Sequence, residues 1–333
     1  MSSSRQRSFW SPALALVLLA PAVGELLSSS MPPAEFLNPF GFLLVVVLYG
    51  GGAVLIRELT FRWGKGWATL LVLGAAYGIV EEGLLCKSFF DPNWPDLGIL
   101  GTYGRWAGVN WVWSLFLTIY HATISIATPI LLINLIFPEQ RSQSWVSRRI
   151  FGLLALLLFA EVIFGLLAFG STPGQPYYPP AILYLLAALL AVILFFVARA
   201  LPHPLFAPKE TRVPRLRWFW LAGFLGIFAL FLINMGLPAT NVHPLITMLI
   251  CAALVALVAR RLLAMSGNGA AWSDHHRFAL AAGALSLFIL IAPFQEIDNP
   301  DRADNTTGMT LVAIAAVLFL RWVWWKVKAH GEG

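Results

Sequence analysis

The chain contains ten apolar runs, each long enough to cross the hydrocarbon core of a membrane as a helix. A core of about 30 Å requires roughly 20 helical residues. Because lipid offers the backbone no hydrogen-bond partner, each run should be a helix that satisfies its own N–H and C=O groups. The runs lie near residues 11–28, 36–57, 67–89, 107–136, 149–169, 180–200, 217–236, 243–265, 277–294 and 308–325.

These runs predict an all-α fold, a polytopic transmembrane helical bundle that forms one integral membrane domain over residues 1–333. The composition agrees, because 59% of the residues are hydrophobic and only 11% are charged, whereas about a quarter of a soluble domain is charged. A cleaved signal peptide is the alternative for the first run, since Arg5 and Arg7 precede it. We favour a retained helix because Glu25 interrupts the expected cleavage region.

Basic residues predict the orientation of the bundle. With ten spans, all but three of the 22 Lys and Arg residues fall in connections on one side, the exceptions being Lys87, Arg105 and Arg302. A miscounted helix would invert every later connection and destroy this segregation. By the positive-inside rule the basic side is cytoplasmic, so we expect both termini inside, in the plasma membrane of a bacterium or archaeon.

The net charge of +6 follows from this bias and requires no acidic partner. We predict no nucleic-acid partner, because no basic stripe is interleaved with stacking aromatic residues. Membrane lipids are the expected surroundings. Cys86 and Cys251 lie in separate apolar runs and form no paired-cysteine metal site. We predict no metal site, and the sequence specifies no cofactor.

Two adjacent acids in the third run are the first candidate for chemistry. Ionisable groups in the bilayer core are costly and usually face a bundle interior or a water-filled cavity. Glu81 and Glu82 lie roughly 21 Å along a helix that starts at Trp67, in its outer half. They point about 100° apart, and Gly78, one turn before Glu82, leaves room for a close neighbour. Such a carboxyl group can serve as a general base or a proton carrier.

The fourth run carries a polar stripe, which is the second candidate. Its residues recur every three or four positions and therefore share one helix face. A histidine in the middle of such a stripe predicts a hydrated, substrate-binding cavity. The alternative is structural, because Ser and Thr in membrane helices often bond to their own backbone. The stripe consists of Asn110, Ser114, Thr118, His121, Ser125 and Thr128.

Other intramembrane or span-end polar residues are Glu25, Glu161 and His243. Taken singly, each is expected to be structural, and Glu25 is expected to reach the outer interface. His121 paired with Glu81 or Glu82 has a structural alternative too, as a static buried pair that fixes helix register.

The segment Val-Glu-Glu-Gly-Leu-Leu-Cys-Lys at 80–87, followed by Phe-Leu-Thr-Ile-Tyr-His at 116–121, resembles the CPBP family of intramembrane proteases, which includes the CAAX prenyl endopeptidases. That family pairs a Glu-Glu-x-x-x-Arg motif with a Phe-x-x-x-His motif. The resemblance implies that Glu81 or Glu82 activates water and that His121 supports the oxyanion. Cys86 stands at the arginine position, Phe116 precedes His121 by five residues, and the third motif of the family is absent.

We therefore predict a membrane enzyme that hydrolyses a membrane-embedded peptide or lipid, with Glu81, Glu82 and His121 catalytic and the remaining stripe binding substrate. The first alternative is a proton-coupled transporter that uses the same residues as a relay. The second is a non-catalytic assembly subunit whose buried polar groups only specify packing.

Overall fold

The computed structural model describes residues 11–171, 175–298 and 304–331. The first half of the described chain contains α1 (Pro12–Pro21), η1 (Ala22–Leu26), α2 (Pro33–Phe36), α3 (Pro39–Val45), η2 (Val46–Gly51), α4 (Gly52–Arg62), α5 (Trp67–Ile79), η3 (Val80–Leu85), η4 (Pro95–Gly101), β1 (Arg105–Trp106), β2 (Val109–Asn110), α6 (Trp111–Tyr120), η5 (His121–Ala127), α7 (Thr128–Ile136) and η6 (Pro138–Gln140). The second half contains α8 (Arg148–Ala168), α9 (Ala181–Ala200), α10 (Leu216–Phe231), η7 (Leu232–Gly236), η8 (Leu237–Ala239), α11 (Pro244–Met265), α12 (Asp274–Ile297) and α13 (Met309–Gly331). Of the segments labelled η, η4, η6 and η8 are 3₁₀ helices and the others are π-helices.

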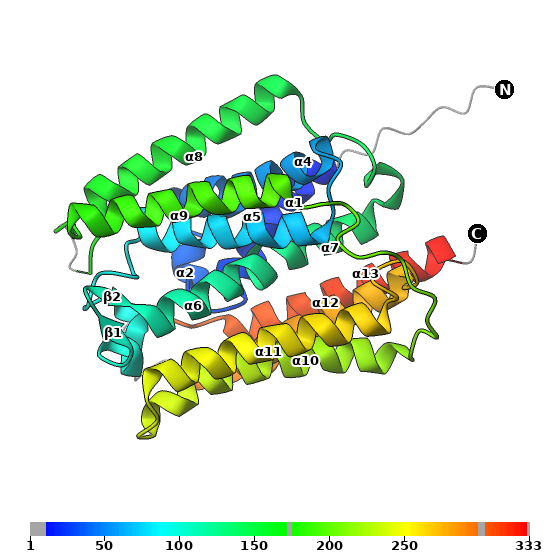
Figure 1. Cartoon of the computed structure of the whole chain (residues 1–333). Coiled ribbons are helices and arrows are strands. Elements are labelled where there is room, and N and C mark those ends of the chain that lie inside the picture. Colours follow the sequence, from blue (N-terminus) through cyan, green and yellow to red (C-terminus); the bar gives the residue numbers. More distant parts are fainter. Residues whose placement is uncertain (1–10, 172–174, 299–303, 332–333) are drawn as a thin grey trace.

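The chain is an all-α polytopic bundle, as predicted (Figure 1). Within the described ranges, nine helices are long and apolar enough to cross a membrane. They are Pro39–Arg62, Trp67–Leu85, Trp111–Ile136, Arg148–Ala168, Ala181–Ala200, Leu216–Ala239, Pro244–Met265, Asp274–Ile297 and Met309–His330. Each corresponds to one predicted run, with ends shifted by a few residues.

The first predicted run forms a shorter helix, Pro12–Leu26, which extends only about 22 Å at 1.5 Å per residue. It begins where Ser11 caps the backbone N–H of Leu14. It ends before Ser29, which has a left-handed φ of 66°, and the chain resumes as the short helix α2 at Pro33. The first residue of α1 and the last of α13 lie at the same end of the bundle (Figure 1), in agreement with an even number of passes.

Two central helices are shielded by the others. In the apolar window of Trp67–Leu85, 72% of the residues are buried, and in that of Trp111–Ile136, 78%. The corresponding share is 11% for α8 and for α11. Helices α8 and α9 cover one side of this centre and α10 to α13 the other (Figure 1). The runs that carry the candidate residues are therefore the best shielded from lipid.

The connection between the helices Trp67–Leu85 and Trp111–Ile136, predicted to lie on the outer side, is an ordered cap with a small hairpin. Strands β1 and β2 pair antiparallel, with Arg105 opposite Asn110. Residues 107–110 are therefore not helical, in contrast to the prediction of a helix over 107–136. The Arg105 guanidinium donates to the carbonyl oxygens of Phe90 (2.8 Å) and Asp91 (3.2 Å). The hairpin forms because Ala107 and Gly108 adopt positive φ values of 50° and 79°, which a helix cannot contain.

Candidate functional site

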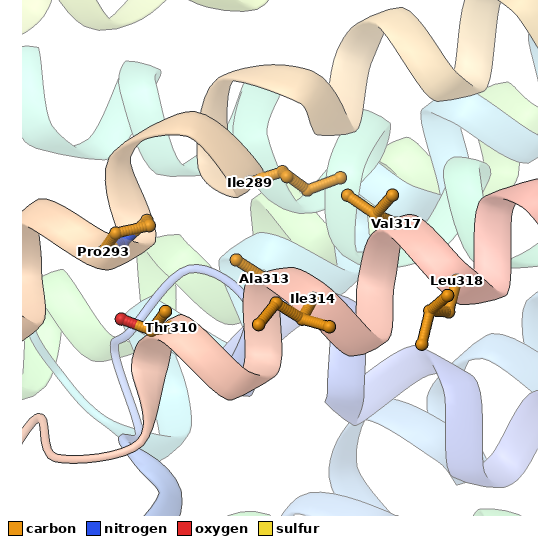
Figure 2. A pocket seen from close by; sticks show the side chains of 7 residues that line it. All are labelled: Ile289, Pro293, Thr310, Ala313, Ile314, Val317 and Leu318. Atoms are coloured by element: carbon orange, nitrogen blue, oxygen red, sulfur yellow. The ribbon is translucent and has the colours of Figure 1, made fainter.

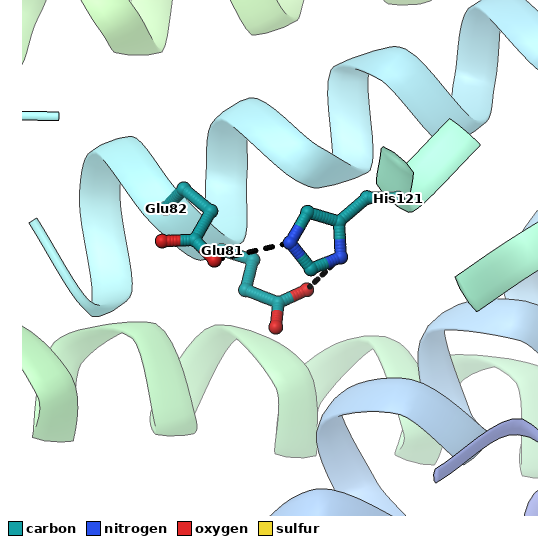
Figure 3. Close-up of side chains that lie close together, drawn as sticks. All are labelled: Glu81, Glu82 and His121. Carbon is teal, nitrogen blue, oxygen red and sulfur yellow. Dashed lines mark hydrogen bonds and ion pairs between the residues drawn. The ribbon is translucent and has the colours of Figure 1, made fainter. Parts of the chain in front are cut away.

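The imidazole of His121 lies between the carboxyl groups of two adjacent residues. Its Nδ1 is 3.2 Å from Oε2 of Glu81, and its Nε2 is 3.0 Å from Oε1 of Glu82 (Figure 3). Neighbouring residues on a helix point in different directions, and here they reach the two opposite nitrogens of one ring. The structure thus brings together the three residues that the sequence singled out as catalytic.

All three side chains are buried. His121 and Glu81 each expose 2% of their surface and Glu82 exposes 9%. Buried charge is stable only when it is paired and hydrogen-bonded. A ring with a carboxyl oxygen near each nitrogen can accommodate the doubly protonated imidazolium, which carries an N–H at both. The site therefore places a ring that can carry a positive charge between two carboxyl groups in an apolar interior.

Glu82 is held at both of its oxygens. Oε1 faces His121, and Oε2 accepts a hydrogen bond from the hydroxyl of Ser88. Ser88 in turn accepts a hydrogen bond from Nε1 of Trp113 at 3.0 Å. These contacts leave the Glu82 carboxyl little freedom to turn, so it is suited to orient the ring of His121.

Glu81 is held less completely. Its Oε2 faces Nδ1 of His121 but has no partner with regular hydrogen-bond geometry. The hydroxyls of Tyr49 and Tyr77 interact with this carboxyl, yet that of Tyr77 is buried without a regular hydrogen bond. Glu81 therefore retains unused capacity to accept a proton or a hydrogen bond.

A third carboxyl group adjoins these two, in contrast to the sequence prediction. Glu25 was expected to reach the outer interface, but it is half-buried and accepts a hydrogen bond from the hydroxyl of Tyr49. The ring of Tyr49 lies 6.0 Å from that of His121, centroid to centroid. Sequence reasoning missed Tyr49, because no polar neighbour or motif marks it in the second run.

The other two residues that were expected to be structural lie in different surroundings. Glu161 on α8 is 7% exposed, interacts electrostatically with Glu81 and has an Oε2 without a hydrogen-bond partner. His243 caps α11, with Nδ1 accepting the backbone N–H of Leu245 at 3.3 Å. The structural interpretation suits His243, whereas Glu161 is a fourth acid beside the site.

Each helix that supplies this site changes from α to π geometry at the site itself. Glu25 lies in η1, Tyr49 in η2, the pair Glu81 and Glu82 in η3, and His121 in η5. Single π turns inside α-helices are rare and occur frequently at functional sites. The wider turn leaves backbone groups less regularly bonded, and four such turns meet around one imidazole.

The polar stripe of the fourth run divides into two groups. Ser125 joins the site, since its Oγ is 3.1 Å from Nδ1 of His121. Three others bond to backbone within their own segment: Asn110 caps Trp113 N (3.0 Å), Ser114 donates to Asn110 O (2.6 Å) and Thr128 donates to Thr123 O (2.8 Å). Thr118 is half-buried. A substrate-binding role for the stripe stays a prediction.

The three central residues are also a possible donor set for a cation. One donor atom from each of Glu81, Glu82 and His121 lies within 4.8 Å of the others. Carboxylate oxygen and imidazole nitrogen suit several divalent metals. Because both ring nitrogens already face carboxylates, a metal would have to take the place of the proton on one of them.

Lys87 follows Cys86, which stands at the arginine position of the CPBP motif. The side chain of Lys87 points away from the site. Its ammonium group donates to the carbonyl oxygens of Gly165 (2.9 Å), Leu166 (3.1 Å) and Phe169 (2.7 Å) at the end of α8. Burial lowers the pKa of this ammonium, and the Cys86 thiol and Asp91 carboxylate partly offset the effect. Lys87 thus caps a helix and does not contact the acids.

Among the cavities of the described chain, two are lined by none of Glu81, Glu82 and His121, and the hydrated cavity expected around His121 stays a prediction. One, of about 220 Å³, lies between α12 and α13 (Figure 2). Its walls are Ile289, Pro293, Thr310, Ala313, Ile314, Val317 and Leu318. The other is at the C-terminal end of α11.

Comparison with known proteins gives a family and no activity. No curated protein and no solved structure matches the chain significantly. Residues 14–321 match the profile described as an uncharacterized membrane protein family, and this match covers all the candidate residues. The chain therefore belongs to that uncharacterized membrane protein family.

Proposed function

We propose that this membrane protein is an intramembrane hydrolase that cleaves a peptide or lipid substrate residing in the bilayer. One observation carries the proposal: His121 is fixed between Glu81 and Glu82 in a buried site where four π-helical turns meet. The partial likeness to CPBP proteases points to the same residues. The proposed location is a bacterial or archaeal plasma membrane.

The contacts favour different roles for the two acids. Glu81 has unused acceptor capacity and is the proposed general base. Glu82, held by Ser88 and His121, is the proposed positioning residue for the ring. His121 is the proposed electrostatic partner of the oxyanion, because its Nδ1 is adjacent to Glu81.

In this mechanism Glu81 takes a proton from water while the water oxygen bonds to the substrate's carbonyl carbon. The carbonyl oxygen becomes negative, and the His121 imidazolium stabilises it. The bond to the leaving nitrogen or oxygen then breaks, and the proton passes from Glu81 to that atom. The products are a carboxylic acid and an amine or alcohol, so atoms and charge balance without a further reactant.

Incorporation of ¹⁸O tests the proposal whatever the identity of the substrate. The purified protein in nanodiscs would be incubated in ¹⁸O-water with a membrane extract, and new carboxyl groups would be detected by mass spectrometry. We expect labelled products with the wild type and none with Glu81→Gln. Glu58→Gln is the matched control, because Glu58 is a fully buried carboxylate at the other end of the bundle.

A proton-coupled transporter is the second candidate, and one feature favours it. Polar side chains continue from Trp113 and Ser88 through Glu82 and His121 to Glu81, as a proton relay would require. Proteoliposomes with an imposed pH gradient distinguish the two. Substrate accumulation that follows the gradient, without ¹⁸O-labelled products, would replace the hydrolase proposal. A non-catalytic assembly subunit would give neither signal, and Glu81→Gln would change only its stability.

A further inference from the structure

The second cavity lies at the end of the bundle that carries the basic connections. It has a volume of about 480 Å³, within the range of roughly 300–1,000 Å³ typical of small-molecule sites. One wall is the last part of α11, and the other is the connection between α9 and α10, which includes Lys209 and Thr211. No residue of the proposed catalytic site takes part.

Specific contacts hold the connecting segment over α11. The backbone N–H of Lys209 donates to Gly267 O at 3.2 Å, and Nδ2 of Asn268 donates to Ala207 O at 2.8 Å. Gly267 has a φ of 59°, and a Cβ there would collide with the carbonyl oxygen of Lys209. Only glycine permits this approach, so this contact fixes the connection that forms one wall of the cavity.

The lining is amphipathic and carries positive charge. Lys209 and Arg260 supply two cations, and no acidic residue lines the cavity. Within the described ranges, neither cation forms an ion pair with a carboxylate. The α11 wall is apolar, with Ala256 and Leu263 among its residues. One side of the cavity thus suits a phosphate group and the other a hydrocarbon chain.

We propose that this cavity binds an anionic phospholipid of the cytoplasmic leaflet. Its phosphate would lie between Lys209 and Arg260, and an acyl chain would follow α11 past Ala256. Basic pockets between helices at the cytoplasmic surface bind anionic lipid headgroups for this reason. The position fits, because the connections at this end of the bundle carry most of the Lys and Arg residues of the chain.

Native mass spectrometry and thermal unfolding of the whole protein test this site. Protein in detergent would be titrated with phosphatidylglycerol, with phosphatidylcholine and with inorganic phosphate. We expect retained phosphatidylglycerol and a raised midpoint with that lipid alone. The double variant Lys209→Gln/Arg260→Gln should bind it roughly tenfold more weakly. Arg261→Gln is the matched control, because Arg261 neighbours Arg260 but does not line the cavity.

Three results would overturn the assignment: equal binding of both lipids, equal loss in Arg261→Gln, or equal stabilisation by inorganic phosphate, which would indicate a site for soluble anions. The single variants Lys209→Gln and Arg260→Gln replace the double variant if it does not remain monodisperse. Each should weaken phosphatidylglycerol binding by itself, and unchanged binding in both would also refute the site.

Discussion

Nε2 of His121 lies 3.0 Å from Oε1 of Glu82, a residue 39 positions earlier in the chain. On the opposite edge of the ring, Nδ1 faces Glu81 at 3.2 Å. The ring therefore separates two carboxyl groups that would otherwise face each other across an apolar interior. The stability of the bundle and the chemistry proposed for it both depend on this arrangement.

Replacing His121 with alanine should destabilise the protein. Both acids would then lose the imidazole between them, and breaking a buried pair by removing one partner costs about 3–5 kcal/mol. Unfolding in detergent, followed by circular dichroism, measures the loss. The double variant His121→Ala/Glu82→Gln should recover part of it, because it removes one of the two uncompensated acids. Additive losses would contradict the pairing.

Gly78→Ala should disturb the site through packing. A Cβ at this position would lie 3.0 Å from Cβ of His121 and 3.4 Å from Cα of Thr118, atoms that cannot move without their backbone. We expect ¹⁸O incorporation to fall roughly tenfold to hundredfold, since small misplacements have effects of that order. Gly152→Ala is the control, because nothing lies within 4 Å of its Cβ, and an equal loss there would refute the explanation.

Lys87→Met should destabilise α8 without affecting the chemistry. Three carbonyl oxygens at the end of α8 would lose a charged donor, and hydrogen bonds to charged groups contribute about 1.5–3 kcal/mol. Hydrogen exchange should accelerate in residues 165–169, while ¹⁸O incorporation per folded molecule stays unchanged. Abolished incorporation in a stable variant would instead assign Lys87 to the site.

Glu58→Gln should release the connection after α7. The carboxylate of Glu58 accepts hydrogen bonds from Arg57 (2.6 Å), Ser144 (2.6 Å) and the backbone N–H of Trp145 (2.8 Å). A neutral amide replaces an acceptor of charged hydrogen bonds with a weaker one. Limited trypsin digestion should then cleave sooner after Arg141. Unchanged cleavage would mean that other contacts hold this connection.

The orientation of the bundle can be tested by labelling single cysteines in a Cys86→Ala/Cys251→Ala background. An impermeant maleimide added to intact cells should label Trp106→Cys, on the exposed outer hairpin, and not Ser142→Cys. Trp106 is 73% exposed and Ser142 lies in the connection after α7. The reverse pattern would invert the topology inferred from the basic residues.

The sequence alone determined the helical membrane class, nine of the spans nearly to their ends, and the expectation that His121 lies near Glu81 or Glu82. Hydrophobic run length and the high cost of ionisable groups in lipid are properties of the chain itself, so they can be read without coordinates. Only the tertiary structure decided that Glu25, Tyr49 and Glu161 belong beside the same site. It also decided that Lys87 caps α8, and that Asn110, Ser114 and Thr128 bond to backbone. The physical reason is that a helix face shows which residues point together, whereas side-chain partners on other helices depend on how the helices rotate and approach, and π turns shift that rotation locally.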